Sequence, residues 1–187
     1  QIKKIVSNKK GINLFLKSNL KLTKKDLGIS VCCDGVCLTL ISITKDILEF
    51  YLSKETINRS KFNKVKINDI INLELPMKYD HKISGHICQG HVDTVAKVNK
   101  ISYIDKSSKY DFLINKKFKK YLIEKASILI NGVSLTISKI TKSGFQIWAI
   151  PHTLKLTNLK DLKKNDVVNI EIDILSKYIK KFINEKK

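Results

Sequence analysis

The chain has 187 residues, of which 43% are hydrophobic, and a formal net charge of +19. That length suits one large domain or two of about 90 to 100 residues, each able to bury a core. No apolar run approaches the ~18 residues of a membrane span, and residues 1–10 lack the apolar stretch of a signal peptide. Arg59 is the only arginine among 36 basic residues. Because bidentate recognition of bases and phosphates favours arginine, we expect a solvated lysine surface and no specific nucleic acid partner.

Most of the predicted elements are short strands. In chain order they cover residues 29–33, 36–43, 48–52, 70–75, 127–130, 133–140, 145–150 and 167–172, which are β-branched runs or alternate apolar and polar side chains. Asp34-Gly35 and Asn131-Gly132 favour tight turns with positive φ. Helices are expected at residues 110–124 and 175–187, and a linker at 76–85. Short strands at regular spacing indicate small closed barrels.

The sequence repeats itself at a spacing of 97 residues. Residues 34–75 and 131–172 align without a gap, with 13 identical pairs in 42. Two copies of so long a unit indicate a duplicated domain and not a solenoid, which needs about three or more copies. We therefore place a domain boundary near His86.

The cysteines do not suggest a metal site. Cys32 and Cys33 would point to opposite faces of a strand, and the four cysteines have no C-x2-C spacing. His86, Cys88 and His91 could supply three ligands, but that reading is the weaker one. Free thiols indicate a reducing compartment, so we expect a cytoplasmic protein.

Reactive side chains differ between the two copies. Cys37 corresponds to Ser134, although neither residue is needed for a turn. The segment from Gly85 to Asp93 holds His86 and His91, each preceded by glycine, and histidine is the natural proton carrier near neutral pH. Two related pockets with different tasks would account for this pattern; the alternative is that the repeated glycines and threonines serve folding only.

At these residues the chain resembles riboflavin synthase. The resemblance rests on Gly-His-x3-Gly-His-Val-Asp (residues 85–93), the paired Gly-Val-Cys/Ser-Leu-Thr loops, Pro-His-Thr-Leu-x-x-Thr (151–157) and Asn-Ile-Glu-Ile-Asp (169–173). It implies an all-β fold of two tandem six-stranded Greek-key barrels, at residues 1–86 and 87–174, with a C-terminal α-helix at 175–187. The implied reaction converts two molecules of 6,7-dimethyl-8-ribityllumazine into riboflavin and 5-amino-6-ribitylamino-uracil, with no cofactor and no metal.

The resemblance also assigns roles to individual positions. It implies His91 as proton carrier and Ser134, Thr136 and Cys37 as groups that activate or replace an attacking water, with His86 and Asp173 as further catalytic candidates. The implied substrate-binding residues are Cys37, Leu38, Thr39, Tyr51, Leu52, Ser53, Lys54, Glu55, Thr56, Gly90, His91, Val92, Lys125, Ser134, Leu135, Thr136, Ala149, Ile150, Pro151, His152, Thr153 and Leu154.

The family opens with a Met-Phe-Thr-Gly-Ile-Val-like stretch that helps to form the first pocket, and here its counterpart is found only at residues 89–92. We therefore expect either a further N-terminal piece or an impaired first pocket.

The C-terminal residues predict an assembly of several subunits. Leu175, Tyr178, Ile179, Phe182 and Ile183 form an apolar helical stripe, and the resemblance implies a homotrimer with active sites between subunits. The stripe could instead pack on its own barrel, and an association with lumazine synthase is left open.

Two alternative functions are considered. One alternative is a non-catalytic lumazine- or flavin-binding antenna protein. A basic nucleic-acid-binding barrel is the other, although aromatic residues, at 7%, form no cluster for stacking bases.

Overall fold

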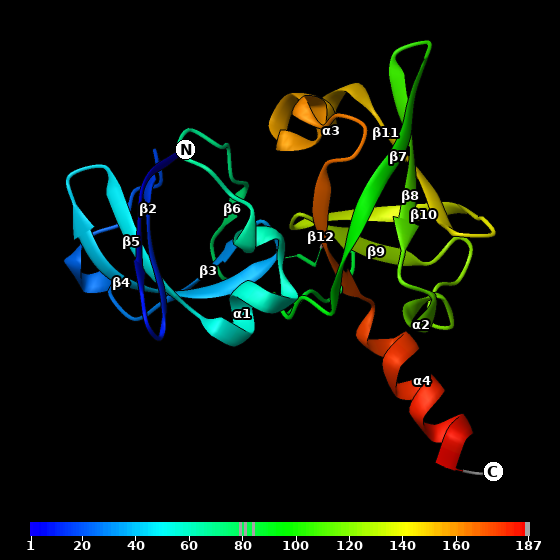
Figure 1. Ribbon diagram of the computed structural model, residues 1–187, viewed down its shortest axis with the longest axis horizontal. Helices are drawn as coiled ribbons and strands as arrows, with labels where there is room; N and C mark the ends of the chain where they lie inside the picture. Colours follow the sequence, from blue (N-terminus) through cyan, green and yellow to red (C-terminus); the bar gives the residue numbers. More distant parts are fainter. Residues whose placement is uncertain (79, 81, 84, 186–187) are drawn as a thin grey trace.

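The computed structural model describes residues 1–78, 80, 82–83 and 85–185. It contains two β-sheet units side by side, with the last helix projecting from the second (Figure 1). We call them the first repeat and the second repeat. The first holds β1 (Ile2–Asn8), β2 (Gly11–Lys17), β3 (Ser30–Cys33), β4 (Val36–Thr44), β5 (Ile47–Ser53) and β6 (Leu73–Glu74). The second holds β7 (Thr94–Ile104), β8 (Ser107–Ile114), β9 (Ser127–Ile130), β10 (Val133–Ile140), β11 (Gly144–Ala149) and β12 (Val167–Ile172).

Helices in the described residues are short except the last. They are the 3-10 turns η1 (Lys24–Asp26), η2 (Lys61–Asn63) and η3 (Asn158–Asp161), and the α-helices α1 (Lys54–Arg59), α2 (Lys116–Lys119), α3 (Pro151–Leu156) and α4 (Ile174–Glu185). None of these helices is long and apolar enough to cross a membrane.

The two repeats share one strand order, which confirms the predicted all-β duplication. The second is a closed barrel, β10-β11-β8-β7-β12-β9, and the first is a six-stranded sheet, β1-β2-β5-β4-β3-β6. In the second repeat β7 pairs with β12 through Thr94–Lys97, which closes the barrel. In the first repeat Ile2 exchanges main-chain hydrogen bonds with Asn68 and Asp69, each at 2.9 Å, as Val98 does with Asn165 and Asp166 in the second. Each repeat buries its own apolar core.

Most predicted elements are confirmed, including the strands at 127–130, 133–140 and 167–172 and the helix at the C-terminus. The expected strand at 70–75 is reduced to β6. The prediction of a helix at residues 110–124 is wrong. Strand β8 runs to Ile114, and the short helix α2 (Lys116–Lys119) follows it. Alternate side chains of β8 are buried, including Tyr110 and Phe112, which is the period of a strand and not of a helix. Strands β1, β2, β7 and β8 were not predicted. The linker expected at 76–85 includes Tyr79, His81 and Ser84, which lie outside the described residues.

The repeats meet through their equivalent turns. A Cβ built on Gly35 would lie 2.9 Å from the nitrogen of Gly132, and one built on Gly132 would lie 3.0 Å from the nitrogen of Gly35. Such a reciprocal contact relates the repeats by an approximate twofold axis. Only glycines allow this approach, and both have φ of +81°.

Buried polar groups surround this contact. Asp34 is fully buried and forms an ion pair with Lys61, with 2.5 Å between Oδ2 and Nζ. Asn158 of the second repeat donates through Nδ2 to Asp34 Oδ1 at 2.9 Å, and Asn169 donates through Nδ2 to the Asp34 carbonyl at 2.8 Å. Burial raises the pKa of Asp34, and the Lys61 ammonium opposes that shift. The network holds the two repeats in one orientation.

Candidate functional site

Both reactive loops lie where neighbouring strands separate. In the first repeat β4 pairs with β5 only from Leu40 onward, although both strands continue past that point. Residues 36–39 of β4 pair on one side with β3 and have no strand partner on the other. The second repeat has the same opening, because β10 pairs with β11 from Ile137 onward and residues 133–136 pair only with β9. At the second opening, main-chain donors and acceptors without a strand partner are available to a flat ligand. At the first opening, the Cys37 N–H already donates to the Gly90 carbonyl at 2.8 Å.

Strand alternation decides which residues face the openings. The Leu40 N–H donates to the Ile29 carbonyl on the β3 side, and the Ile137 N–H donates to the Ala126 carbonyl on the β9 side. Since main-chain groups of successive residues point to opposite edges of a strand, those of Cys37 and Thr39 face the first opening. Those of Ser134 and Thr136 face the second.

Residues 85–91, which we call the bridging segment, contact both reactive loops. His86 Nδ1 lies 2.7 Å from Ser134 Oγ, and Gly85 packs so closely that an added Cβ would lie 2.5 Å from that oxygen. At the other end the Gly90 carbonyl accepts the Cys37 N–H at 2.8 Å, which places exposed His91 one residue away from that contact. The bridging segment, whose two histidines the sequence suggested as one cluster, therefore contacts one loop through His86 and the other through Gly90.

Cys88 lies between the two ends of the bridging segment. Its Sγ is 3.7 Å from His86 Nδ1. Burial, reinforced by the Glu171 carboxylate, raises the pKa of the Cys88 thiol to about 11. A thiol with that pKa stays protonated near neutral pH and is a poor nucleophile, which leaves Ser134 and Cys37 as the better candidates.

Several other predicted residues have local structural partners. The Tyr51 hydroxyl donates to the Lys10 carbonyl at 2.9 Å, and Ser53 Oγ accepts the Thr56 N–H at the start of α1. Asp173 Oδ1 accepts the Leu175 N–H at 3.0 Å, at the start of α4. Ala149 ends β11, Ile150 links it to α3, and residues 151–154 lie in α3, with Pro151 in its first turn. Exposed Lys125 has φ of +69°. The roles of these residues toward a ligand stay predictions.

Two acidic residues near the bridging segment were not predicted to take part. Glu171 is buried, and its two carboxylate oxygens accept the N–H groups of Gln89 and His91, both at 2.8 Å. Asp93 accepts the Ile172 N–H at 2.8 Å and pairs with Lys177 of α4 at 3.0 Å. The sequence did contain a pattern that could have drawn attention to Glu171. Asn-x-Glu recurs at equivalent positions of both repeats, at residues 72–74 and 169–171.

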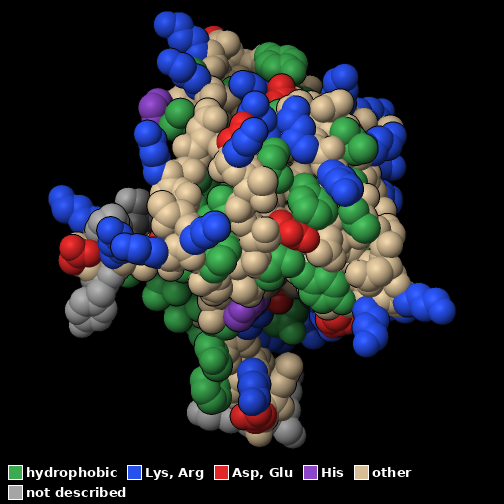
Figure 2. Space-filling model, turned by 90° about the vertical axis from the view of Figure 1, so that its left-hand side faces the viewer, with side chains coloured by type: hydrophobic (Ala, Val, Ile, Leu, Met, Phe, Trp, Pro, Cys, Tyr) green, Lys and Arg blue, Asp and Glu red, His purple; other side chains and the backbone are tan. Residues whose placement is uncertain are grey.

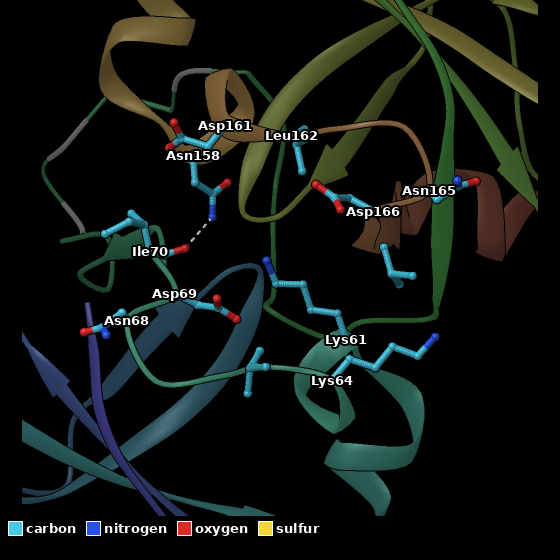
Figure 3. A pocket seen from close by; sticks show the side chains of 12 residues that line it. Lys61, Lys64, Asn68, Asp69, Ile70, Asn158, Asp161, Leu162, Asn165 and Asp166 are labelled. Carbon is cyan, nitrogen blue, oxygen red and sulfur yellow. Dashed lines mark hydrogen bonds between the residues drawn. The ribbon is translucent and has the colours of Figure 1, made fainter.

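A cavity of about 480 Å³ lies elsewhere, on the approximate twofold axis (Figure 3). It is lined by Lys61, Lys64, Val65, Asn68, Asp69 and Ile70 and by their exact equivalents at a spacing of 97, Asn158, Asp161, Leu162, Asn165, Asp166 and Val167. None of these is a predicted substrate-binding residue. The cavity is the groove between the repeats, and its lining residues are not those of the reactive loops. Its charges are mixed, and the Lys61 ammonium is already paired with Asp34.

Metal-ligand geometry is not seen in the described part of the chain, where no three His, Cys, Asp or Glu side chains are grouped to hold an ion. All four cysteines are free.

Comparison with known proteins gives consistent matches along the chain. A family model of the lumazine binding domain matches twice, at residues 1–76 and 89–173. A riboflavin synthase of Photobacterium phosphoreum is 35% identical over 164 residues, covering 88% of this chain and 75% of that protein. A riboflavin synthase of Bacillus subtilis is 32% identical over 172 residues, covering 92% and 80%.

Solved structures give matches of the same extent. The structure of LumP complexed with riboflavin superposes with a TM-score of 0.81 at 26% identity, covering 91% of this chain and 93% of that one. The structure of LumP complexed with 6,7-dimethyl-8-(1'-D-ribityl) lumazine gives 0.79 at the same identity, covering 91% and 92%.

Proposed function

This chain belongs to the lumazine-binding domain family that includes the riboflavin synthases, and from that membership we propose that it is itself a riboflavin synthase. Two molecules of 6,7-dimethyl-8-ribityllumazine would react, one giving a four-carbon unit to the other. The products are riboflavin and 5-amino-6-ribitylamino-uracil, so all atoms are accounted for without an oxidant or a reductant.

The observation that carries the proposal is the 2.7 Å contact between His86 Nδ1 and Ser134 Oγ beside an opening with unpaired main-chain groups. An imidazole at this distance can take the proton of the hydroxyl while the oxygen attacks the ring or orients a water molecule. His91, beside the Cys37 loop, would remove a proton from the acidic C7 methyl group of a lumazine. Holding two rings in register can itself contribute about 7–11 kcal/mol.

We propose that the two pockets have unequal tasks, because Cys37 stands where the second repeat has Ser134. One lumazine would be the donor of carbon atoms and the other the acceptor. A homotrimer, in which the first repeat of one subunit faces the second repeat of its neighbour, would bring unlike pockets together. The exposed apolar side chains of α4 support such an assembly, and a cytoplasmic location fits it.

The decisive experiment is turnover. Purified protein is mixed with 6,7-dimethyl-8-ribityllumazine and EDTA, and the absorbance of riboflavin is followed. Product should form without added metal or nicotinamide. Activity that EDTA abolishes and zinc restores would contradict a metal-free mechanism.

A second candidate, a lumazine- or flavin-binding carrier, is favoured by the similarity to LumP. It predicts a different outcome of the same assay, namely stoichiometric ligand binding with no riboflavin formed. The side chains of Ser134, His86 and Cys37 favour the enzyme, because a carrier needs no proton donor or nucleophile at the openings.

A further inference from the structure

Glu171 occupies an unusual position for a carboxylate. It lies on β12 in the second repeat, is only 2% exposed, and belongs to a strand whose other side chains are mostly apolar. Burying a carboxylate is costly unless its oxygens are well bonded. Here both oxygens accept main-chain N–H groups at 2.8 Å, one from Gln89 and one from His91.

The residue between these two donors is the one that reaches the other repeat. Gly90 has φ of +75°, and a Cβ added to it would lie 2.7 Å from Cys37 Cβ. Its carbonyl accepts the Cys37 N–H at 2.8 Å. Glu171 thus fixes the residues on both sides of Gly90. It therefore sets the point on the main chain from which the His91 side chain extends, relative to the Cys37 loop.

We propose that Glu171 is a positioning residue that acts on the first pocket from the second repeat, by orienting the main chain that carries His91. The proposal rests on the proposed function, since His91 matters as a proton carrier in that reaction. The Glu171 carboxylate is hydrogen-bonded to main-chain N–H groups and is not assigned a chemical step.

A second carboxylate on a strand supplies a control. Glu49 lies on β5 and accepts a hydrogen bond from the Asn13 side chain, with 2.7 Å between Nδ2 and Oε1. It therefore bonds a side chain of the first repeat, whereas Glu171 bonds the main chain of the bridging segment. Glu171→Gln and Glu49→Gln make the same substitution at these two places.

The kinetic test is a double-mutant cycle. Glu171→Gln keeps one acceptor oxygen and replaces the other by an NH₂ group, which cannot accept an N–H. Turnover should fall about 10-fold or more with less than about a 2-fold change in lumazine affinity, whereas Glu49→Gln should match the wild type. In a His91→Ala background, Glu171→Gln should add less than about a 2-fold loss, because both changes remove one effect. Independent, multiplying losses or unchanged turnover in Glu171→Gln would overturn the proposal.

A spectroscopic test does not depend on turnover. In ¹H–¹⁵N spectra the amide protons of Gln89 and His91 should shift upfield in Glu171→Gln and stay in place in Glu49→Gln. If Glu171→Gln does not fold, Glu171→Asp keeps the carboxylate on a shorter side chain and should shift the same two amides. Unmoved amides would show that Glu171 does not hold this segment. If the wild-type protein makes no riboflavin, the proposed function fails, and the amide shifts still decide whether Glu171 orients the main chain at His91.

Discussion

At the scale of single residues, the reactive groups differ between copies while their surroundings are alike. Ser134 and Cys37 occupy equivalent places at equivalent openings, yet the first is bonded to an imidazole and the second is contacted by main chain. The hydroxyl therefore has a base beside it that a turn residue would not need. In the proposed reaction, this difference would let the two pockets treat two identical lumazine molecules differently.

Changing Ser134 to Ala should lower turnover about 10-fold or more while changing lumazine affinity much less, because the hydroxyl acts mainly in the transition state. Steady-state kinetics and ligand titration measure the two effects. Ser138→Ala is the control, since this serine lies on the same strand and only donates to the Gln146 carbonyl. A loss of affinity with unchanged turnover would mean that Ser134 only shapes the pocket.

Gly90 tests the contact between the bridging segment and the Cys37 loop. Gly90→Ala combines a positive φ with a steric clash against Cys37, whereas Gly28→Ala, at φ of +89°, meets nothing within 4 Å. Both should lose about 1–2 kcal/mol of unfolding free energy from the backbone conformation. Only Gly90→Ala should also lose turnover, by about 10-fold or more. Equal activities of the two variants would show that this contact is not needed.

At the scale of elements, α4 leaves a stripe of five apolar side chains uncovered. Leu175, Tyr178, Ile179, Phe182 and Ile183 are each between 50% and 64% exposed. Figure 2 shows hydrophobic side chains along one side of this projecting helix. The possibility that the stripe folds back on its own barrel is thus not realised in this structure. A helix of 12 residues is marginal alone in water, so a partner surface would stabilise it.

Deleting the residues after Asp173 should lower the sedimentation mass and the activity together, if the helices hold a homotrimer with shared active sites. Tyr178→Lys combined with Phe182→Lys should do the same without shortening the chain, because both side chains are exposed and their loss leaves the barrel core intact. Analytical ultracentrifugation and the riboflavin assay measure the two effects. A monomer that keeps the full rate would rule out shared sites.

At the scale of the whole molecule, the orientation of the repeats depends on a buried ion pair that only one copy has. Asp34 and Lys61 correspond to Asn131 and Asn158, so the second repeat has amides at the same places. Removing one member of a buried pair leaves an uncompensated charge, which costs about 3–5 kcal/mol. Replacing both by the amides of the other repeat leaves no charge to compensate.

Lys61→Met should therefore destabilise the protein at pH 7 by about 3–5 kcal/mol, and Asp34→Asn combined with Lys61→Asn should recover most of that loss. The loss in Lys61→Met should depend on pH. Burial raises the pKa of Asp34, so the folded state binds its proton more tightly than the unfolded state, and stability falls as the pH rises through this range. The loss should be small where Asp34 is protonated and should grow as it ionises. Urea unfolding between pH 4 and pH 7 measures this, and a pH-independent loss would contradict it.

Local sequence was enough to predict the duplication, most strands and the tight turns. The alternation at residues 133–140 and the Asn131-Gly132 turn are properties of neighbouring residues, and the structure confirms them, with φ of +47° and +81° at the turn. The helix expected at 110–124 fails for the opposite reason. Its residues are compatible with both periods, and the barrel selects a strand because β8 must pair with β7 and β11.

The sequence by itself determined which residues carry reactive groups, namely Ser134, Cys37, His86 and His91. Only the tertiary structure decided how they are combined. His86 lies 48 positions from Ser134 along the chain, and Glu171 lies 80 positions from His91, so no local pattern can pair them. These contacts form because the bridging segment passes from one repeat to the other and is held there by main-chain hydrogen bonds, and a main-chain bond leaves almost no trace in the identity of the residue that donates it.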